Sequence, residues 1–288
     1  MGSPLFQRSE LLIGHEAQDQ LWRTRVILFG LGGVGSWCAE GLLRSGVGHL
    51  TLVDSDVVCI TNVNRQLQAT PAAVGKPKAL ELRRRLLEVN PDAEVVARQE
   101  VFGLETRDSF ALESFDFIID AVDSLSNKLG LIEAAMRSGR VLFTAMGASA
   151  KLDPTRIQVS SIWKTTNCPL ARRIRKRLRR HGTTGDCLCV HSDELQPNHE
   201  ESTLCGSERC LCPRTLRDDD GSAQPAHEWC SSKKRINGSL VHVTATFGMV
   251  LAGLVVQDVV RRCAGARTPA AVDPAGFPAA DAAAAAKS

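Results

Sequence analysis

A glycine-rich turn between two apolar segments, residues 26–29 and 49–53, constrains the fold more than any other feature of the chain. The turn, residues 30–35, fits the pattern G-x-G-x-x-G, and residues 36–45 after it have the composition of a helix. Asp54 follows the second apolar segment. Strand, turn, helix, strand and a terminal acid form one nucleotide-binding unit, in which glycines let the backbone approach phosphate and Asp54 accepts hydrogen bonds from ribose.

Beyond this unit, short apolar strands alternate with amphipathic helices, as they do in α/β proteins. We expect strands at residues 93–98, 115–120 and 140–145, and helices at residues 15–22, 74–89, 105–112 and 125–136. Residues 155–162 alternate between apolar and polar types, which predicts an antiparallel strand added to the sheet. The sequence therefore predicts a Rossmann-like α/β fold with a doubly wound, mainly parallel sheet and an antiparallel extension.

Residues 1–262 are expected to form one globular domain, although its second half departs from the alternating pattern. Residues 182–238 are rich in Gly, Ser, Asp, Cys and Pro, which favours an irregular crossover region. Residues 240–262 are largely apolar but include polar and charged side chains, so we expect a buried or interfacial helix and no membrane span. The tail, residues 263–288, is rich in Ala and Pro, and we expect it to be disordered.

Bulk composition restricts the class of protein less than these patterns do. The chain has 288 residues and a net charge of +3, so nothing global requires a polyanionic partner. The first ten residues lack an apolar stretch of signal-peptide length, and we therefore expect a cytoplasmic protein. Its ten cysteines are then expected to be reduced thiols, metal ligands or reactive groups rather than a disulfide framework.

Polar side chains gather where the predicted strands end, which is the edge at which open α/β sheets bind ligands. Acids follow the second and fourth strands, and amides and cations lie between them: Asp54, Asp56, Asn62, Arg65, Gln66, Lys78, Asp120 and Asp123. Arg65 and Lys78 can neutralise phosphates and Asp123 can hold Mg²⁺, so the set suits a triphosphate better than a dinucleotide. The alternative is that these are ordinary solvated loop charges.

Five short motifs resemble, in the same order, those of the ubiquitin-activating-enzyme-like adenylyltransferases. They are Gly30-x-Gly32-Gly33-x-Gly35, Asp54-x-Asp56, Asn62-x-Asn64-Arg65-Gln66, Gly75-Lys76-x-Lys78 and Asp120-x-x-Asp123. The resemblance covers roughly residues 6–262. It implies the adenylyltransferase fold, with ATP at the glycine turn and Mg²⁺ at Asp123. It also implies that a substrate carboxylate attacks the α-phosphate of ATP, which gives an acyl-adenylate and pyrophosphate.

The residue roles implied by this resemblance extend over the first half of the chain. The residues expected at the cofactor are Gly30, Gly32, Gly33, Gly35, Asp54, Asp56, Asn62, Arg65, Gln66, Lys78, Asp120, Asp123 and Ser124. The residues expected to act in catalysis are Arg8, Arg65, Lys78 and Asp123. In relatives an N-terminal arginine reaches the other subunit's ATP site, so the resemblance implies a homodimer in which Arg8 is supplied in trans.

Within that superfamily, the chain looks most like the tRNA threonylcarbamoyladenosine dehydratases. The segments that carry this resemblance are residues 35–37, 45–48, 58–62, 152–159 and 243–248. The resemblance implies that ATP activates the carboxylate of threonylcarbamoyladenosine beside the anticodon of a tRNA. An intramolecular attack on the activated group then gives the cyclic form with loss of water, and the tethered nucleophile makes this step favourable.

Two other functions remain open. One is adenylation of the C-terminus of a ubiquitin-like or sulfur-carrier protein, which a C-x-x-C zinc pair and a required cysteine would favour. The other is a cysteine-rich metal- or redox-binding scaffold that binds nucleotide without turnover. Metal content and pyrophosphate release would separate the scaffold from an enzyme. A sulfur-relay protein is a further candidate partner.

A strongly basic segment at residues 170–180 predicts a helix with an apolar stripe at Leu170, Ile174 and Leu178. Seven of its eleven residues are cations, and such one-sided charge is typical of phosphate binding. We therefore expect a tRNA-binding face, with a solvated helix face as the alternative. The side chains expected to contact RNA are Arg172, Arg173, Lys176, Arg177 and Arg180.

Most of the cysteines crowd the irregular segment. They are Cys187, Cys189, Cys205, Cys210, Cys212 and Cys230. Their C-x-C spacing differs from the two C-x-x-C pairs that hold structural zinc in sulfur-carrier-activating relatives, so that zinc site is not carried over. Free thiols are the default interpretation, and the alternatives are a zinc site or a thioester or persulfide cysteine at Cys187 or Cys230.

Overall fold

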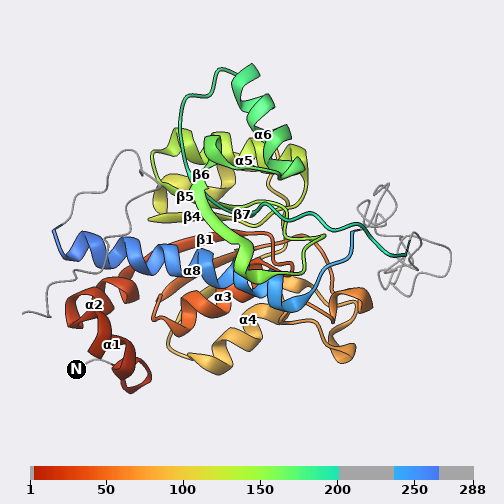
Figure 1. Cartoon of the computed structure of the whole chain (residues 1–288). Coiled ribbons are helices and arrows are strands. Elements are labelled where there is room, and N and C mark those ends of the chain that lie inside the picture. Colours follow the sequence, from red (N-terminus) through yellow and green to blue (C-terminus); the bar gives the residue numbers. More distant parts are fainter. Residues whose placement is uncertain (1–2, 201–236, 266–288) are drawn as a thin grey trace, which may run out of the picture.

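The computed structural model describes residues 3–200 and 237–265, and a seven-stranded sheet forms the centre of this part of the chain (Figure 1). The strand order is β3-β2-β1-β4-β5-β7-β6. The strands are β1 (Arg25–Phe29), β2 (His49–Val53), β3 (Glu94–Arg98), β4 (Phe117–Asp120), β5 (Val141–Ala145), β6 (Ile157–Ser161) and β7 (Leu188–Ser192). Only the β6–β7 pair is antiparallel, so the predicted mainly parallel sheet with an antiparallel extension is confirmed.

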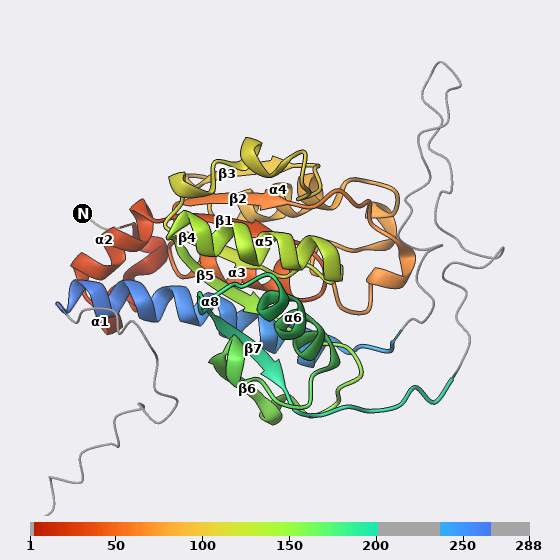
Figure 2. The same ribbon diagram turned by 90° about the horizontal axis from the view of Figure 1, so that it is seen from above.

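Helices cover both faces of this sheet (Figures 1 and 2). They are α1 (Gln7–Ile13), α2 (His15–Arg23), α3 (Gly35–Arg44), α4 (Lys78–Val89), α5 (Leu125–Ser138), α6 (Pro169–Arg180) and α8 (Val241–Cys263). The α3, α4 and α8 helices pack on one face, and α5 and α6 pack on the other. This is the predicted doubly wound arrangement, in which each amphipathic helix buries its apolar stripe against the sheet.

The central strand β1 shows why its sequence is apolar without alternation. Val26 and Leu28 point into the core under α3 and α8, whereas Ile27 and Phe29 point into the core under α5. All four side chains are buried. A parallel strand covered on both faces has no polar side, and this accounts for the continuous apolar run.

The turn after β1 depends on glycine at two positions. Gly30 has a φ of 86°, and a Cβ there would lie 2.7 Å from the carbonyl oxygen of Ala121. At Gly35, a Cβ would overlap the carbonyl oxygen of Gly30. Because these neighbours are backbone atoms, they cannot move aside as a flexible side chain can. Any other residue at Gly30 or Gly35 would therefore open the turn and separate it from the loop after β4.

The long apolar helix α8 is a core element, as predicted. Its 23 residues are long and apolar enough to cross a membrane by length and composition, yet 56% of the relevant window is buried inside the fold. Its main neighbour is α3, and small residues allow a close approach. A Cβ on Gly41 would lie 2.9 Å from Ala252, and one on Gly248 would overlap backbone at Val34. We therefore assign its apolar character to packing inside the fold.

The prediction that residues 182–238 are irregular is wrong at their start. Residues 188–192 form β7, which pairs in parallel with β5 and antiparallel with β6. The strand is short, and Cys, His and Ser interrupt its apolar pattern, so the local sequence does not indicate a strand. Burial explains its stability, because Cys189, Val190 and His191 are all enclosed by neighbouring elements.

Two of the predicted helices also differ from the structure. The helix expected at residues 74–89 begins only at Lys78, because Pro77 occupies the position before it. The helix expected at residues 105–112 is replaced by two 3₁₀ turns, Arg107–Phe110 and Leu112–Ser114. Residues 201–236 and the Ala/Pro-rich tail beyond residue 265 lie outside the described part of the chain, so the predictions made for them stay predictions.

Candidate functional site

Asp54, at the end of β2, joins the glycine turn to the following loop. The backbone amide of Leu31 donates to Asp54 Oδ2 at 2.6 Å, and that of Asp56 donates to Oδ1 at 2.8 Å. Burial raises the pKa of the Asp54 carboxyl, whereas the charge of Lys78 and the two backbone donors oppose that rise. Each carboxylate oxygen retains a second lone pair, so Asp54 remains able to accept a hydrogen bond from ribose.

Lys78, the first residue of α4, lies among three acids at this edge. Its Nζ contacts Asp56 Oδ2 at 2.7 Å, and its side chain is only 7% exposed. Burial by itself would lower the pKa of the ammonium, but the charges of Asp54, Asp56 and Asp123 outweigh it and raise the pKa. Lys78 is therefore cationic, and a phosphate that binds here would share it with Asp56.

Arg65 lies on the loop between β2 and α4, and this loop packs beside the glycine turn. Its Nη1 donates to the Thr61 carbonyl at 2.9 Å, and Trp37 Nε1 donates to the Arg65 carbonyl at 3.0 Å. A Cβ on Gly33 would lie 3.1 Å from the Arg65 side chain and from Thr244 on α8. The loop, the turn and the start of α8 thus enclose one small region.

Two amides predicted at the cofactor lie on the same loop. Asn62 is 9% exposed and accepts the Cys59 backbone amide at 3.0 Å, so its oxygen closes a local turn. Gln66 is 6% exposed and its Oε1 is buried, with no hydrogen-bond partner in the described part of the chain. Its amide nitrogen lies near Gly32, so Gln66 faces the turn.

Asp120, at the end of β4, lies behind this region. It is fully buried, and its Oδ2 contacts Lys128 Nζ at 2.8 Å and accepts the Thr144 hydroxyl at 2.7 Å. Its Oδ1 accepts the Val122 amide at 3.0 Å. This environment favours support of the loop at residues 121–124 over direct contact of Asp120 with a nucleotide.

Asp123 is the exposed acid of that loop, and its negative charge helps to raise the pKa of Lys78. The described residues contain no group of three His, Cys, Asp or Glu side chains that could hold a metal by themselves. Mg²⁺ is commonly held by one or two carboxylates together with substrate phosphates, and Asp123 fits that role. Ser124, which follows it, is the residue before α5.

The formal charges at this edge also fit a divalent cation. Asp54, Asp56 and Asp123 supply three negative charges, whereas Lys78 and Arg65 supply two positive ones. A polyphosphate would therefore meet a slightly negative edge, and a bound Mg²⁺ would reverse that sign. The residues present fit a metal that arrives with ATP.

Arg8 is the predicted catalytic residue that the fold does not bring to this region. It is exposed on α1, which packs with α2 beside the C-terminal end of α8 (Figure 1). The glycine turn meets the other end of α8, at Thr244. Because α8 has 23 residues and is about 34 Å long, its two ends are far apart, and α1 lies at the end away from the glycine turn.

The basic helix α6 forms where predicted and presents most of its cations to solvent. Ala171, Ile174 and Leu178 are buried, so Ala171 replaces the partly buried Leu170 in the predicted stripe. Arg175 donates to the carbonyl and hydroxyl of Thr165, and Arg179 stacks 5.5 Å from the ring centre of Trp163. The other cations form no ion pair with a described residue: Arg172, Arg173, Lys176, Arg177 and Arg180.

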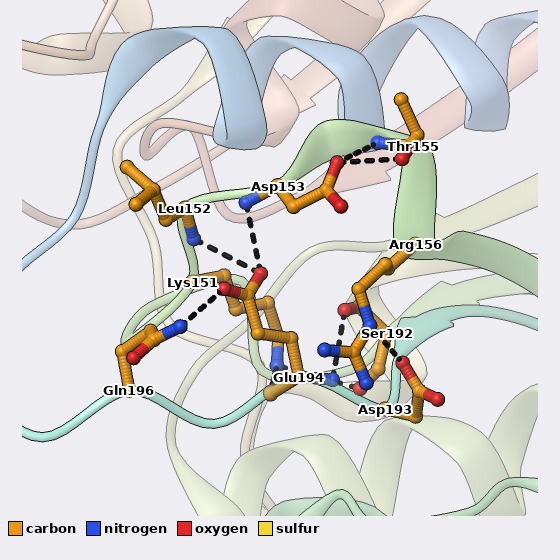
Figure 3. Close-up of polar contacts among 9 residues, drawn as sticks. All are labelled: Lys151, Leu152, Asp153, Thr155, Arg156, Ser192, Asp193, Glu194 and Gln196. Carbon is orange, nitrogen blue, oxygen red and sulfur yellow. Dashed lines mark hydrogen bonds and ion pairs between the residues drawn. The ribbon is translucent and has the colours of Figure 1, made fainter.

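A second polar cluster, which the sequence did not indicate, joins residues 150–153, 192–196 and 238–242, and we name it the Lys151 junction. Figure 3 shows the polar contacts between its first two segments. Lys151 is 6% exposed and donates to the carbonyls of Ser192 and Glu194. The Glu194 carboxylate accepts the amides of Leu152 at 3.0 Å and Asp153 at 2.9 Å. The backbone amide of Ala150 donates to the Gly238 carbonyl, which ties the junction to the segment before α8.

Three further residues organise the nucleotide edge and were not predicted. Gln68 donates to the Leu31 carbonyl at 2.9 Å, and Lys128 and Thr144 hold Asp120. For Lys128 a signal was present, because a lysine between Leu125 and Leu129 interrupts an apolar helix face. Gln68 and Thr144 carry no such signal, since their partners are distant in sequence.

The cysteines that the structure describes are buried or partly buried thiols. Cys187 is 8% exposed and Cys189 is fully buried, so the reactive interpretation of Cys187 is not supported. Burial raises the pKa of the Cys189 thiol well above its ordinary value, and the neighbouring Cys187 adds to the rise. Cys205, Cys210, Cys212 and Cys230 lie outside the described residues.

The chain is similar to known proteins over almost its whole length. Residues 6–277 match the ThiF family. The tRNA threonylcarbamoyladenosine dehydratase of Bacillus subtilis (strain 168) is 35% identical over 257 residues, which cover 89% of this chain and 94% of that protein.

Solved structures agree with the sequence comparison. E. coli tRNA N6-threonylcarbamoyladenosine dehydratase in complex with AMP has a TM-score of 0.76 and 28% identity, covering 91% of this chain and 98% of the other. The same enzyme in complex with ATP has a TM-score of 0.74 and 28% identity, covering 90% and 95%. These likenesses extend over the sheet and the helices that form the nucleotide edge, and the chain belongs to the ThiF family.

Proposed function

We propose that the chain is an ATP-dependent dehydratase that cyclises threonylcarbamoyladenosine beside the anticodon of a tRNA and acts in the cytoplasm. The observation that carries the proposal is the likeness to tRNA threonylcarbamoyladenosine dehydratases, which covers 94% of the Bacillus subtilis protein. A sulfur carrier protein adenylyltransferase of Thermus thermophilus matches only 45% of this chain. The length of the match therefore favours a tRNA substrate over a carrier protein.

The nucleotide edge supports the first half of the reaction. The glycine turn would approach the phosphates, Asp54 would hold the ribose, and Lys78 and Arg65 would neutralise phosphate charge. The remaining residues proposed to line this site are Asp56, Asn62, Gln66, Asp123 and Ser124. When bound with ATP, Mg²⁺ would stabilise the charge that develops on the leaving pyrophosphate.

The chemistry asks the protein mainly to position two substrates. The carboxylate of the modified nucleoside attacks the α-phosphate, pyrophosphate leaves, and the acyl-adenylate forms. The nucleophile for the second step belongs to the same nucleoside, so it attacks at a high effective concentration and releases AMP. This requires no nucleophilic side chain, which agrees with the burial of Cys187 and Cys189.

The exposed cations of α6 support the binding of tRNA. Their side chains point away from the core because Ala171, Ile174 and Leu178 occupy the buried face. Two of the seven cations hold the helix in place through Thr165 and Trp163. The remaining cations are available to tRNA phosphates, whose binding depends strongly on salt.

A homodimer would complete the site. The helix α1, which carries Arg8, lies at the end of α8 away from the glycine turn of its own chain, as expected if Arg8 acts at the site of a partner. Leu5, Leu11 and Leu12 around it are 57%, 88% and 86% exposed, which gives this end of the molecule an apolar surface. Such a surface suits burial in a two-fold interface.

A nucleoside assay tests the proposed function. The protein is incubated with ATP, Mg²⁺ and tRNA that carries threonylcarbamoyladenosine. The tRNA is then digested, and the masses of its nucleosides are measured by mass spectrometry. We expect the modified nucleoside to lose one water, with one pyrophosphate released per product. Unchanged nucleoside mass, together with pyrophosphate release only when a carrier protein is added, would replace the tRNA substrate with a protein substrate.

A further inference from the structure

Lys128 is a fully buried lysine on α5 whose ammonium reaches the loop that carries Asp123. It lies beneath residues 121–124 and outside the group formed by Asp54, Asp56 and Lys78. Its neighbours on the helix, Leu129 and Ile132, are apolar core residues. Because no water reaches a lysine in this position, its ammonium must find its ion-pair and hydrogen-bond partners inside the protein.

The contacts of Lys128 hold one short segment from both sides. Its Nζ lies 2.8 Å from Asp120 Oδ2 and donates to the Val122 carbonyl at 2.9 Å. Asp120 Oδ1 accepts the Val122 amide at 3.0 Å. The donor and the acceptor of Val122 are therefore both fixed by one ion pair, and the next residue is Asp123. Thr144 steadies the pair through its hydroxyl, at 2.7 Å.

The same segment also supports the glycine turn. The Ala121 amide donates to the Phe29 carbonyl at 2.8 Å, at the last residue of β1. A Cβ on Gly30 would lie 2.7 Å from the Ala121 carbonyl oxygen, so the turn and the segment are in backbone contact. A shift of residues 121–122 would therefore move Asp123 and disturb the turn together.

We propose that Lys128 is a positioning residue for the adenylation site, which acts through Asp120 and Val122 to fix the segment that carries Asp123 beside the glycine turn. The proposal rests on the proposed function, in which Asp123 binds Mg²⁺ with ATP. A buried ion pair adds little net stability over an apolar pair of similar volume. The Lys128–Asp120 pair is better explained by the geometry that it imposes on the segment than by stability.

The test begins with the Lys128→Met variant of the full chain. We expect amide hydrogen exchange at residues 121–124 to accelerate in the absence of nucleotide, because Val122 loses its carbonyl partner. The stimulation by Mg²⁺ of the binding of a non-hydrolysable ATP analogue should fall. The Mg²⁺ concentration for half-maximal turnover should rise about 10- to 100-fold, the usual effect of residues that orient a metal ligand.

A second variant guards against loss of folding, because Lys128→Met leaves Asp120 buried without a cation. Asp120→Asn combined with Lys128→Met removes both charges and should fold, yet it still lacks the donor to Val122. We expect it to show the same fast exchange and weak Mg²⁺ response. Wild-type exchange and a wild-type Mg²⁺ response in this double variant would overturn the positioning role.

Arg85→Met is the matched control. Arg85 contacts the buried Glu40 at 3.6 Å, which links α4 to α3 away from the segment. This variant should lower the thermal midpoint without changing exchange at residues 121–124 or the response to Mg²⁺. Equal changes in both variants would reduce Lys128 to a stability role. If the wild-type protein does not dehydrate tRNA, the proposed function fails, whereas exchange and Mg²⁺-dependent nucleotide binding still decide the role of Lys128.

Discussion

Lys78 and Lys151 are both buried at the C-terminal edge of the sheet, but different groups stabilise their ammonium ions. At the nucleotide edge, Lys78 is surrounded by carboxylates, which raise the pKa of its ammonium against the effect of burial. At the Lys151 junction, burial lowers the pKa of Lys151, and the acceptors of its ammonium are the backbone carbonyls of Ser192 and Glu194. The ammonium of Lys78 is stabilised by carboxylates, whereas that of Lys151 is bound by backbone carbonyls.

The difference separates a site for ligands from a structural joint. A lysine paired with Asp56 can exchange one anion for another, so a phosphate can replace or share its partner. Lys151 donates to the carbonyls of Ser192, the last residue of β7, and of Glu194, two residues further on, so it ties segments of the chain together. Its ammonium therefore has little capacity left to bind an incoming anion. Asn64 donates to the Ser239 carbonyl at 2.9 Å, so the two regions are connected through the loop of Arg65.

The largest expected effect is on turnover at the nucleotide edge. Asp123→Asn and Lys78→Met should each lower the dehydration rate by about two to three orders of magnitude, because each removes an electrostatic contact of the transition state. Lys151→Met should instead lower stability by about 1–3 kcal/mol, since buried carbonyls lose a donor, and change turnover little. Single-turnover rates and urea unfolding measure the two quantities. Equal losses of rate at Lys78 and Lys151 would remove the distinction between the regions.

Binding of tRNA should depend on neither lysine but on α6. Replacement of Arg173, Lys176 and Arg180 by Ala should weaken tRNA binding and leave ATP binding unchanged. Each lost phosphate contact should flatten the slope of log affinity against log salt by about 0.7–0.9. Fluorescence titration of a labelled anticodon stem-loop at several salt concentrations gives both quantities.

The control for α6 removes the same charge elsewhere. Replacement of the exposed Arg23, Arg84 and Arg140 by Ala should change the affinity for the stem-loop much less and keep its salt slope. If the α6 variant and this control behave alike, only net charge matters, and α6 would be an ordinary solvated surface.

Subunit mixing extends the comparison to a third region, α1. Arg8→Ala and Asp123→Asn dimers should each be nearly inactive. Mixed dimers should regain about one working site of two, since one site then has both residues. The measurement is dehydration rate after subunit exchange, verified by native mass spectrometry. Absence of recovery in verified mixed dimers would show that Arg8 is not supplied in trans.

The smallest expected effect is the acid stability of the Lys151 junction. Hydrogen bonds from Gln196 and from the amides of Asp153 and Leu152 lower the pKa of Glu194 from 4.5 to about 2. A lowered folded-state pKa stabilises the fold above pH 4.5, and this contribution is lost as the pH falls through about 2. Glu194→Gln should therefore be less stable than the wild type at pH 5, and the difference should shrink towards pH 2. Urea midpoints across this range check the trend, and a constant difference would contradict it.

Much of the fold and nucleotide edge could be predicted because the signals are local. The glycine turn and the acids after β2 and β4 each follow a strand within a few residues, and Lys78 ends the short motif Gly75-Lys76-x-Lys78 at the start of α4. In a parallel sheet those strand ends meet at one edge, so the topology brings the motifs together without further information. Strand β7 was missed because its five residues carry little local pattern and are stabilised only by burial between β5 and β6.

The sequence by itself determined the doubly wound sheet, the glycine turn and the acids and cations that accompany it, because periodicity and strand-end motifs act over short distances. Only the tertiary structure decided which of these side chains are paired, which are buried and which lie away from the nucleotide edge. It paired Asp120 with Lys128, buried Cys187 and Cys189, and placed α1, which carries Arg8, at the end of α8 away from the glycine turn. The physical reason is that burial and pairing are set by residues far apart in the chain, such as Lys151 and Ser192, whose contact no local pattern encodes.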